Sequence, residues 1–217
     1  MKALFLSTWF PHPTDNGSKV RVYHLIRSLS ERHRVSLLSF AFGTADPDEA
    51  HALHRLCEEV HVVRRNPFER GRLLSSLRFL SPSPIVSRPL PGMTRAVRRI
   101  LAGTDFDVVI ASTDVMATYA LSAPSKTVKV LEEHNAGSRR SWERYCAQES
   151  FLQTLRCWVS WQKARHYEAR LFGQFDLCTM VSEQDRRASL ETLPGYRGRI
   201  EVVPNGVDCD HNRPSIA

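Results

Sequence analysis

The chain has 217 residues, of which 42% are hydrophobic and 24% are charged, with 10 Gly and 12 Pro. This composition excludes a disordered, collagen-like or disulfide-built protein, and the length suits one large domain with a sizeable core. The formal net charge of +7 favours anionic partners such as phosphates, nucleic acid or a membrane surface.

Short apolar runs alternate with helical periodicity along the chain. The runs predict strands at 3–8, 35–42, 60–63, 107–111, 127–131, 177–181 and 200–203. Apolar spacing between them predicts helices at 20–29, 50–57, 93–101, 115–121 and 185–193, and a long helical region at 137–172. Because strands that alternate with helices form parallel sheets covered on both faces, we predict an α/β fold with a doubly wound, Rossmann-like sheet.

The basic excess is concentrated in one segment of the chain. Residues 64–99 contain nine Arg, no Lys and a single acidic residue, Glu69, which gives a local charge of +8. The nine are Arg64, Arg65, Arg70, Arg72, Arg78, Arg88, Arg95, Arg98 and Arg99. Since apolar residues accompany them, we predict a basic surface for an anionic lipid or a lipid-linked phosphate. We expect no nucleic acid partner, because no recognised binding motif accompanies the charge.

A second basic region, at 139–170, interleaves Arg and Lys with six aromatic residues. Such a mixture can mark a membrane interface or stacked nucleic-acid bases. We favour an ordinary amphipathic helix pair, with Leu152, Leu155 and Val159 facing the core. No apolar run approaches the roughly 18 residues that a membrane span needs, so we expect any membrane contact to be peripheral. Five cysteines without a CxxC pair favour a reducing cytoplasm.

The loop after the first strand contains a candidate phosphate site. Asn16, Gly17 and Ser18 open the first predicted helix, where free N–H groups and the helix dipole favour an anion. Lys19 and Arg21 add positive charge nearby. An ordinary helix N-cap explains Asn and Ser at these positions equally well. The chain contains neither GxGxxG nor GxxxxGK[ST], so a dinucleotide fingerprint and a P-loop are unsupported.

His134 follows the fifth predicted strand, between Glu133 and Asn135. There an imidazole could contact a hydroxyl-rich ligand, although a lone histidine is more often structural. Glu132 and Glu133 point to opposite sides of the strand and therefore form no paired acid–base site. We predict no metal site: His51, His54 and Cys57 recur every third residue on one helix, but no fourth ligand accompanies them.

Taken together, the loop sequences resemble family 4 glycosyltransferases. The resemblance is carried by segments that follow the family's order over nearly the whole chain, at 11–21, 105–109, 133–135, 181–185 and 202–208. The last of these, with Asn205, Gly206 and Asp208, is similar to the segment that joins the two halves of these enzymes. The combination is far more specific than any single motif.

The resemblance implies a GT-B enzyme, in which two Rossmann-like domains face each other across a cleft. Such an enzyme moves a sugar from a nucleotide-diphosphate sugar to a glycan or lipid-linked acceptor, with retention and without a metal ion or other cofactor. This chain is similar to the N-terminal, acceptor-side half, with a domain at 1–203 and the start of the interdomain linker at 204–217. We expect the C-terminal donor-binding domain to be absent and the chain alone to be inactive.

The resemblance also assigns roles to individual residues. It implies that Asn16, Gly17 and Ser18 lie against the donor diphosphate and that His134 is the catalytic residue beside the donor sugar and acceptor. Residues expected on the acceptor side or in the cleft are Lys19, Arg21, Glu133, Asn135, Ser182 and Glu183. We expect a location in the cytoplasm or at the cytoplasmic face of a membrane. The alternative is a stand-alone, non-catalytic module that binds a partner domain or an anionic lipid surface.

Overall fold

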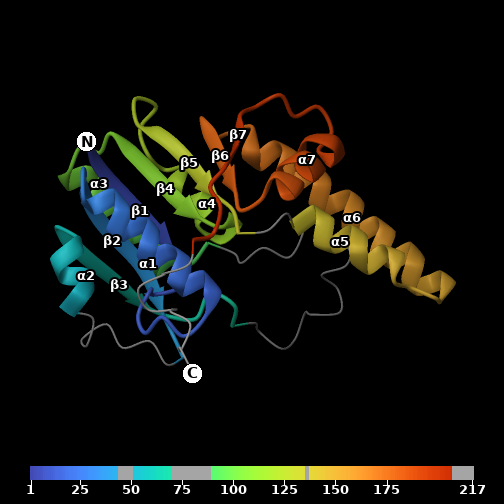
Figure 1. Cartoon of the computed structure of the whole chain (residues 1–217), viewed down its shortest axis with the longest axis horizontal. Helices are drawn as coiled ribbons and strands as arrows, with labels where there is room; N and C mark the ends of the chain where they lie inside the picture. Colours follow the sequence, from blue (N-terminus) through green and yellow to red (C-terminus); the bar gives the residue numbers. More distant parts are fainter. Residues whose placement is uncertain (44–50, 70–88, 135–136, 207–217) are drawn as a thin grey trace, which may run out of the picture.

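The computed structural model describes residues 1–43, 51–69, 89–134 and 137–206 (Figure 1). Within these ranges seven parallel strands form one sheet in the order β3-β2-β1-β4-β5-β6-β7. The strands are β1 (Lys2–Ser7), β2 (Arg34–Ala41), β3 (Glu59–Arg64), β4 (Val108–Ser112), β5 (Val128–Glu132), β6 (Leu177–Met180) and β7 (Ile200–Val202). The described helices are α1 (Gly17–Ser30), α2 (His51–Leu56), α3 (Pro91–Gly103), α4 (Asp114–Ala120), α5 (Gly137–Cys146), α6 (Phe151–Phe172) and α7 (Glu183–Thr192). The predicted doubly wound sheet is confirmed.

Two apolar clusters, one on each face of the sheet, hold the helices in place. On one face Phe5 of β1 packs with Val22 and Ile26 of α1, and all three are fully buried. On the other face Leu4 and Leu6 pack with residues of α3, α4 and the C-terminal end of α6. Successive residues of β1 thus serve opposite faces, which explains the unbroken apolar run of this strand.

The strand order reverses between β1 and β4. The chain passes outward from β1 to β2 and β3, then returns to β4 on the other side of β1. In open parallel sheets, ligands bind beyond the carboxyl ends of the strands at such a reversal. The fold therefore places its natural binding position just after Ser7 and Ser112, the last residues of these two strands.

The beginning of α1 faces this position. Asn16 is the N-cap, with extended backbone, and its side-chain oxygen accepts a hydrogen bond from the Lys19 N–H at 3.1 Å. This cap satisfies one of the first N–H groups of the helix and leaves those of Gly17 and Ser18 without an intrahelical acceptor. A Cβ added to Gly17 would have no described atom within 4 Å, so the space beside its backbone is open.

The long predicted helical region consists of two helices, α5 and α6, which lie side by side and extend beyond β6 and β7 (Figure 1). The expectation that Leu152 and Leu155 face the core is wrong, because these side chains are 76% and 49% exposed. Only the C-terminal end of α6 reaches the sheet, where Leu171 and Phe172 are buried. The rest of α6 has α5 as its neighbour instead of the sheet.

Candidate functional site

Polar contacts tie the carboxyl ends of β1, β4 and β5 together. The Ser7 hydroxyl donates to the Trp9 carbonyl at 2.6 Å, and Thr8 Oγ1 lies 2.8 Å from Thr113 Oγ1. Thr113 has a φ of 72°, in the left-handed region that is strained for a β-branched residue. Its N–H donates to the Glu132 carbonyl at 2.7 Å. The turn from β4 into α4 is thereby held against β5, directly at the strand reversal.

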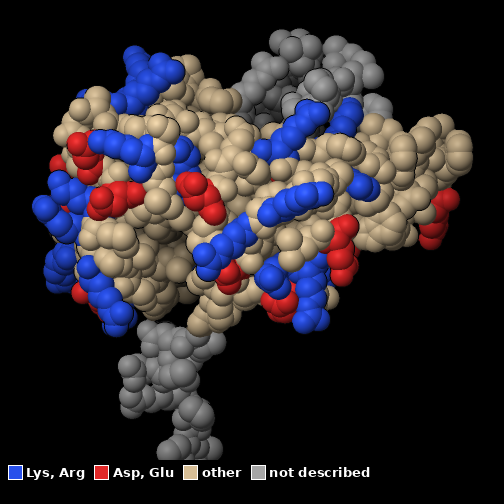
Figure 2. Space-filling model, turned by 90° about the horizontal axis from the view of Figure 1, so that it is seen from above, with Lys and Arg blue, Asp and Glu red and all other residues tan. Residues whose placement is uncertain are grey.

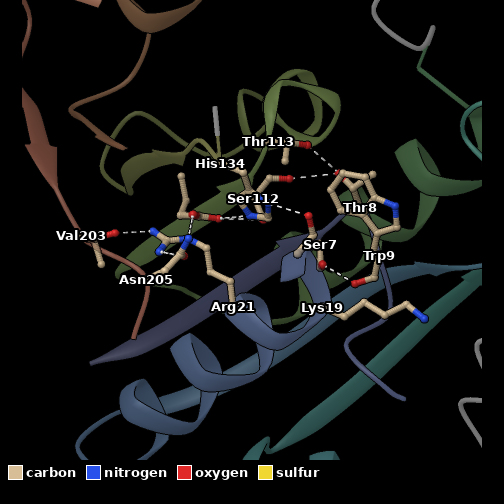
Figure 3. Close-up of polar contacts among 12 residues, drawn as sticks. Ser7, Thr8, Trp9, Lys19, Arg21, Ser112, Thr113, His134, Val203 and Asn205 are labelled. Carbon is tan, nitrogen blue, oxygen red and sulfur yellow. Dashed lines mark hydrogen bonds and ion pairs between the residues drawn. The ribbon is translucent and has the colours of Figure 1, made fainter. Parts of the chain in front are cut away.

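Glu132, the last residue of β5, is the centre of a buried hydrogen-bond network, whose members Arg21, Ser112 and His134 are labelled in Figure 3. Its Oε1 accepts from Arg21 Nε at 2.6 Å, and its Oε2 accepts from Ser112 Oγ at 2.9 Å and lies 3.0 Å from His134 Nε2. Burial by itself would raise the pKa of Glu132, but the hydrogen bonds and charges of His134 and Arg21 outweigh it and lower the pKa. Glu132 is therefore an ionised carboxylate that only accepts.

This carboxylate fixes the orientation of the His134 ring. Because ionised Glu132 only accepts, Nε2 of His134 carries a proton, and Nδ1 is turned toward Ser18 Oγ at 3.2 Å. The Trp9 ring stacks on the imidazole, with centroids 6.0 Å apart and an interplanar angle of 26°. His134 is thus held by β5, by the loop after β1 and by the beginning of α1.

Arg21 joins the same network to the segment after β7. Besides its contact with Glu132, its other two nitrogens donate to Asn205 Oδ1 and to the Val203 carbonyl, both at 2.8 Å. The Arg21 and Glu132 side chains are only 6% and 4% exposed. A buried guanidinium therefore connects α1, the end of β5 and the first residues beyond the sheet.

The structure brings several of the predicted site residues together and separates others. Ser18 contacts His134 directly, and Asn16 and Gly17 come just before it at the beginning of α1. Arg21 is linked to His134 through Glu132, and Asn205 is bonded to Arg21. Lys19 turns away from His134, as Figure 3 shows, and its Nζ pairs with Asp15 at 2.9 Å. Gly206 is described and exposed, whereas Asn135 and Asp208 lie outside the described residues.

Ser182 and Glu183 serve the beginning of α7. Ser182 is its N-cap and accepts from the Asp185 N–H at 3.1 Å, while its hydroxyl donates to the Asp185 carboxylate at 2.6 Å. Glu183 pairs with Arg186 and Arg187 at the surface, at 3.0 and 3.1 Å. Among the contacts of the described residues, none joins the beginning of α7 to His134. The contacts of Ser182 and Glu183 stabilise the first turn of α7.

Sequence reasoning missed Trp9, Ser112 and the central role of Glu132. Trp9 directly follows the β1 run, and Ser112 ends β4. Both stand where a ligand of this fold would bind. Examining the residues after all the predicted strands, the fourth included, would have found them. The alternation of side chains along a strand correctly predicted that Glu132 and Glu133 point to opposite sides. The pairing of Glu132 with Arg21 could not be predicted, because 111 residues separate them and no local sequence pattern links them.

The buried side chain of Glu133 belongs to a second acidic group, with the half-buried side chains of Asp114 of α4 and Glu168 of α6. Burial raises the pKa of Glu133 well above its ordinary value, and the charges of Asp114, Glu168 and Glu132 raise it further. Burial likewise raises the pKa of Asp114, and that of Glu168 to about 7. In the described part of the chain, no group of three or more His, Cys, Asp or Glu is arranged to hold a metal ion.

These shifts make stability depend on pH with a definite sign. The Glu168 pKa of about 7 lies above the ordinary value of 4.5, so the folded state holds a proton that the unfolded chain releases, and stability falls as pH rises from 4.5 through 7. We expect Glu168→Gln to stabilise the protein by up to about 3 kcal/mol near pH 8 and to have little effect near pH 4.5. Urea unfolding across this pH range measures the difference.

The control for this substitution is Glu149→Gln, in the exposed loop between α5 and α6. Its effect should be small at every pH. A Glu168→Gln gain that did not grow with pH would contradict the assignment of a protonated, half-buried carboxyl group.

The described part of the predicted basic surface lies on β3 and α3. Arg64 ends β3 and Arg65 follows it, while Arg95, Arg98 and Arg99 are exposed on α3. These two elements are neighbours, since a Cβ at Gly92 would lie 3.8 Å from Val63 Cγ1. The remaining predicted members lie outside the described residues, namely Arg70, Arg72, Arg78 and Arg88. Across the described ranges, no helix has the length and apolarity needed to cross a bilayer.

The fold is similar to that of several solved glycosyltransferases. Sucrose-phosphate synthase from Thermosynechococcus elongatus matches 97% of this chain over 49% of its own length, with 15% identity and a TM-score of 0.62. Phytolacca americana UGT2, complexed with UDP-2fluoro-glucose and pterostilbene, matches 96% of this chain over 55% of its own, with 10% identity and a TM-score of 0.56. The chain therefore has the architecture of one Rossmann-like half of a GT-B glycosyltransferase and spans about half the length of these structures.

The family model for Glycosyltransferase Family 4 matches residues 15–211. The chain belongs to this family, as the order of its loop motifs predicted. A search of curated protein sequences finds no significant match.

Proposed function

We propose that this chain is the acceptor-side domain of a retaining glycosyltransferase. The enzyme would transfer a sugar from a nucleotide-diphosphate sugar to a glycan or lipid-linked acceptor, as in polysaccharide biosynthesis. The observation that carries the proposal is the meeting of His134 with Ser18, 3.2 Å apart although 116 residues separate them, at the strand reversal. Membership of Glycosyltransferase Family 4 supports sugar transfer as the class of reaction.

The donor diphosphate would lie against the beginning of α1. Gly17 and Ser18 present N–H groups there, at the positive end of a 14-residue helix. The open space beside Gly17 would let phosphate oxygens approach the backbone closely. As the sugar leaves, charge grows on the diphosphate, and fixed N–H donors would stabilise it without a metal ion.

His134 would position the reacting groups beside this diphosphate. Glu132 holds Nε2 as a donor and turns Nδ1 toward Ser18, so that Nδ1 can form a hydrogen bond with a ligand hydroxyl that displaces Ser18 Oγ. The ring needs no reorientation when a ligand arrives, because Trp9 and Glu132 already hold it. Residues 204–217 would begin the linker to the donor-binding half, and Arg21 would anchor this linker through Asn205.

A transfer assay on two lengths of the protein tests this proposal. We expect the 217-residue chain alone to release no nucleoside diphosphate from UDP-, GDP- or ADP-sugars, because the opposite wall of the cleft would be missing. Protein extended through a C-terminal donor-binding half should transfer labelled sugar to membrane material of the source organism. Robust turnover by the 217-residue chain alone would contradict the expectation that its activity depends on a second half. An inactive extended protein, with every donor, would contradict the function itself.

A further inference from the structure

The α5–α6 hairpin, residues 137–172, exposes an unusual amount of apolar surface. Large hydrophobic side chains exposed on it are Trp142, Phe151, Leu152, Leu155 and Trp158. Phe151 and Leu152, at the beginning of α6, are 80% and 76% exposed. The other exposed large hydrophobic residues of the described chain are scattered over separate elements. Contiguous apolar surface of this kind marks an interaction site.

The exposed residues of α6 share one face of the helix. Phe151, Leu155 and Trp158 follow the i, i+4, i+7 spacing, and Leu152 and Val159 lie directly beside them. Lys163 and Arg170 join Trp158 and Val159 in lining a shallow, mostly apolar groove along the same helix. The face therefore combines a broad apolar stripe with a cationic border, which is typical of a helix lying at a membrane interface.

Positive charge accompanies the hairpin. Residues 137–172 contain seven Arg and Lys against three Glu, a net charge of +4. Figure 2 shows Lys and Arg side chains along the hairpin, with uncharged surface and a smaller number of Asp and Glu side chains between and beside them. A second copy of this chain would bring like charges together on such a face, which disfavours self-association. An anionic bilayer instead complements both the charge and the apolar stripe.

The hairpin holds itself together without the exposed stripe. Trp142 of α5 lies 4.6 Å from Trp161 of α6, between ring centroids, and 5.1 Å from Tyr145. The Arg165 guanidinium lies 5.0 Å from the centre of the Trp161 ring. These contacts fill the space between the two helices, so Phe151 and Leu152 are available to another surface.

We propose that the α5–α6 hairpin docks on an anionic phospholipid bilayer, with Phe151 and Leu152 entering the headgroup region. The flanking Arg and Lys side chains would contact lipid phosphates. This inference goes beyond the proposed glycosyl transfer and does not rest on it. It also assigns membrane contact to a surface other than the arginines of 64–99.

Vesicle co-sedimentation of the full 217-residue chain tests the proposal. We expect binding to vesicles of phosphatidylcholine mixed with phosphatidylglycerol, weaker binding to phosphatidylcholine alone, and a decline with added salt. The double substitution Phe151→Asp/Leu152→Asp should weaken binding at least about tenfold, because it places two charges where apolar side chains meet the bilayer. Both positions are exposed, and thermal unfolding followed by circular dichroism would verify that the variant is folded.

Matched controls separate this surface from its competitors. Val128→Asp/Leu190→Asp places the same charges at two other exposed apolar positions and should leave binding unchanged. Arg98→Glu/Arg99→Glu should weaken binding less than Phe151→Asp/Leu152→Asp; the reverse order would overturn the proposal in favour of the 64–99 surface. It would also be overturned if the wild-type chain ignored anionic vesicles, or if the hairpin variant abolished only self-association or binding to nucleic acid.

Discussion

Arg21→Ala is expected to lower the free energy of unfolding by about 3–5 kcal/mol, a large part of the stability of a domain of this size. The substitution removes the cation but leaves Glu132 charged and almost fully buried. It also leaves Asn205 Oδ1 and the Val203 carbonyl without their donor. Urea unfolding near neutral pH, followed by circular dichroism, measures the change.

Two further variants distinguish the buried charge from a general effect on α1. Arg27→Ala removes an exposed arginine from the same helix and should change stability by less than about 0.5 kcal/mol. Adding Glu132→Gln to Arg21→Ala should recover part of the loss, because no uncompensated carboxylate would remain. If Arg21→Ala cost no more than Arg27→Ala, the network would not support the fold as described.

His134→Ala is expected to lower kcat for sugar transfer by about 100-fold or more in the extended protein, with a smaller change in the donor KM. The reason is that the imidazole would hold the reacting groups in place, whereas the helix N–H groups would still bind the diphosphate. Initial rates with labelled donor measure both constants.

The matched control for this loss is His166→Ala, an exposed histidine of α6 outside the His134 network. It should leave kcat unchanged. Glu132→Gln leaves His134 in place but should also reduce kcat. The new amide can present its N–H group to the imidazole and disturb the orientation of the ring. Transfer by His134→Ala at nearly the wild-type rate would contradict a role for this residue in the reaction.

Most of the fold could be predicted because each element carries a local signal. The β1 run has buried side chains on both faces, and the Val22 and Ile26 spacing of α1 marks its apolar face. The same reasoning, that the apolar face of a helix packs on the core, gave the wrong result for α6. The equally regular apolar stripe of this helix is exposed to solvent. Periodicity reports that a helix has an apolar face, but not what covers it.

The candidate site could be predicted only in part. Position after a strand identified His134, and position before a helix identified Asn16, Gly17 and Ser18. Their convergence was implied by family resemblance alone. The Arg21–Glu132 pair and the stacking of Trp9 on His134 depend on segments more than 100 residues apart, which only the folded chain brings together.

We propose above all that the beginning of α1 and His134 form one wall of a nucleotide-sugar site. Its most direct test is a titration of the isotopically labelled 217-residue chain with UDP, GDP and ADP, followed by two-dimensional NMR. We expect shifts concentrated at the Gly17 and Ser18 amides and the His134 ring with one of these nucleotides, and none there with its uncharged nucleoside. Unchanged signals at all three residues up to millimolar nucleotide, or shifts confined to another face, would contradict it.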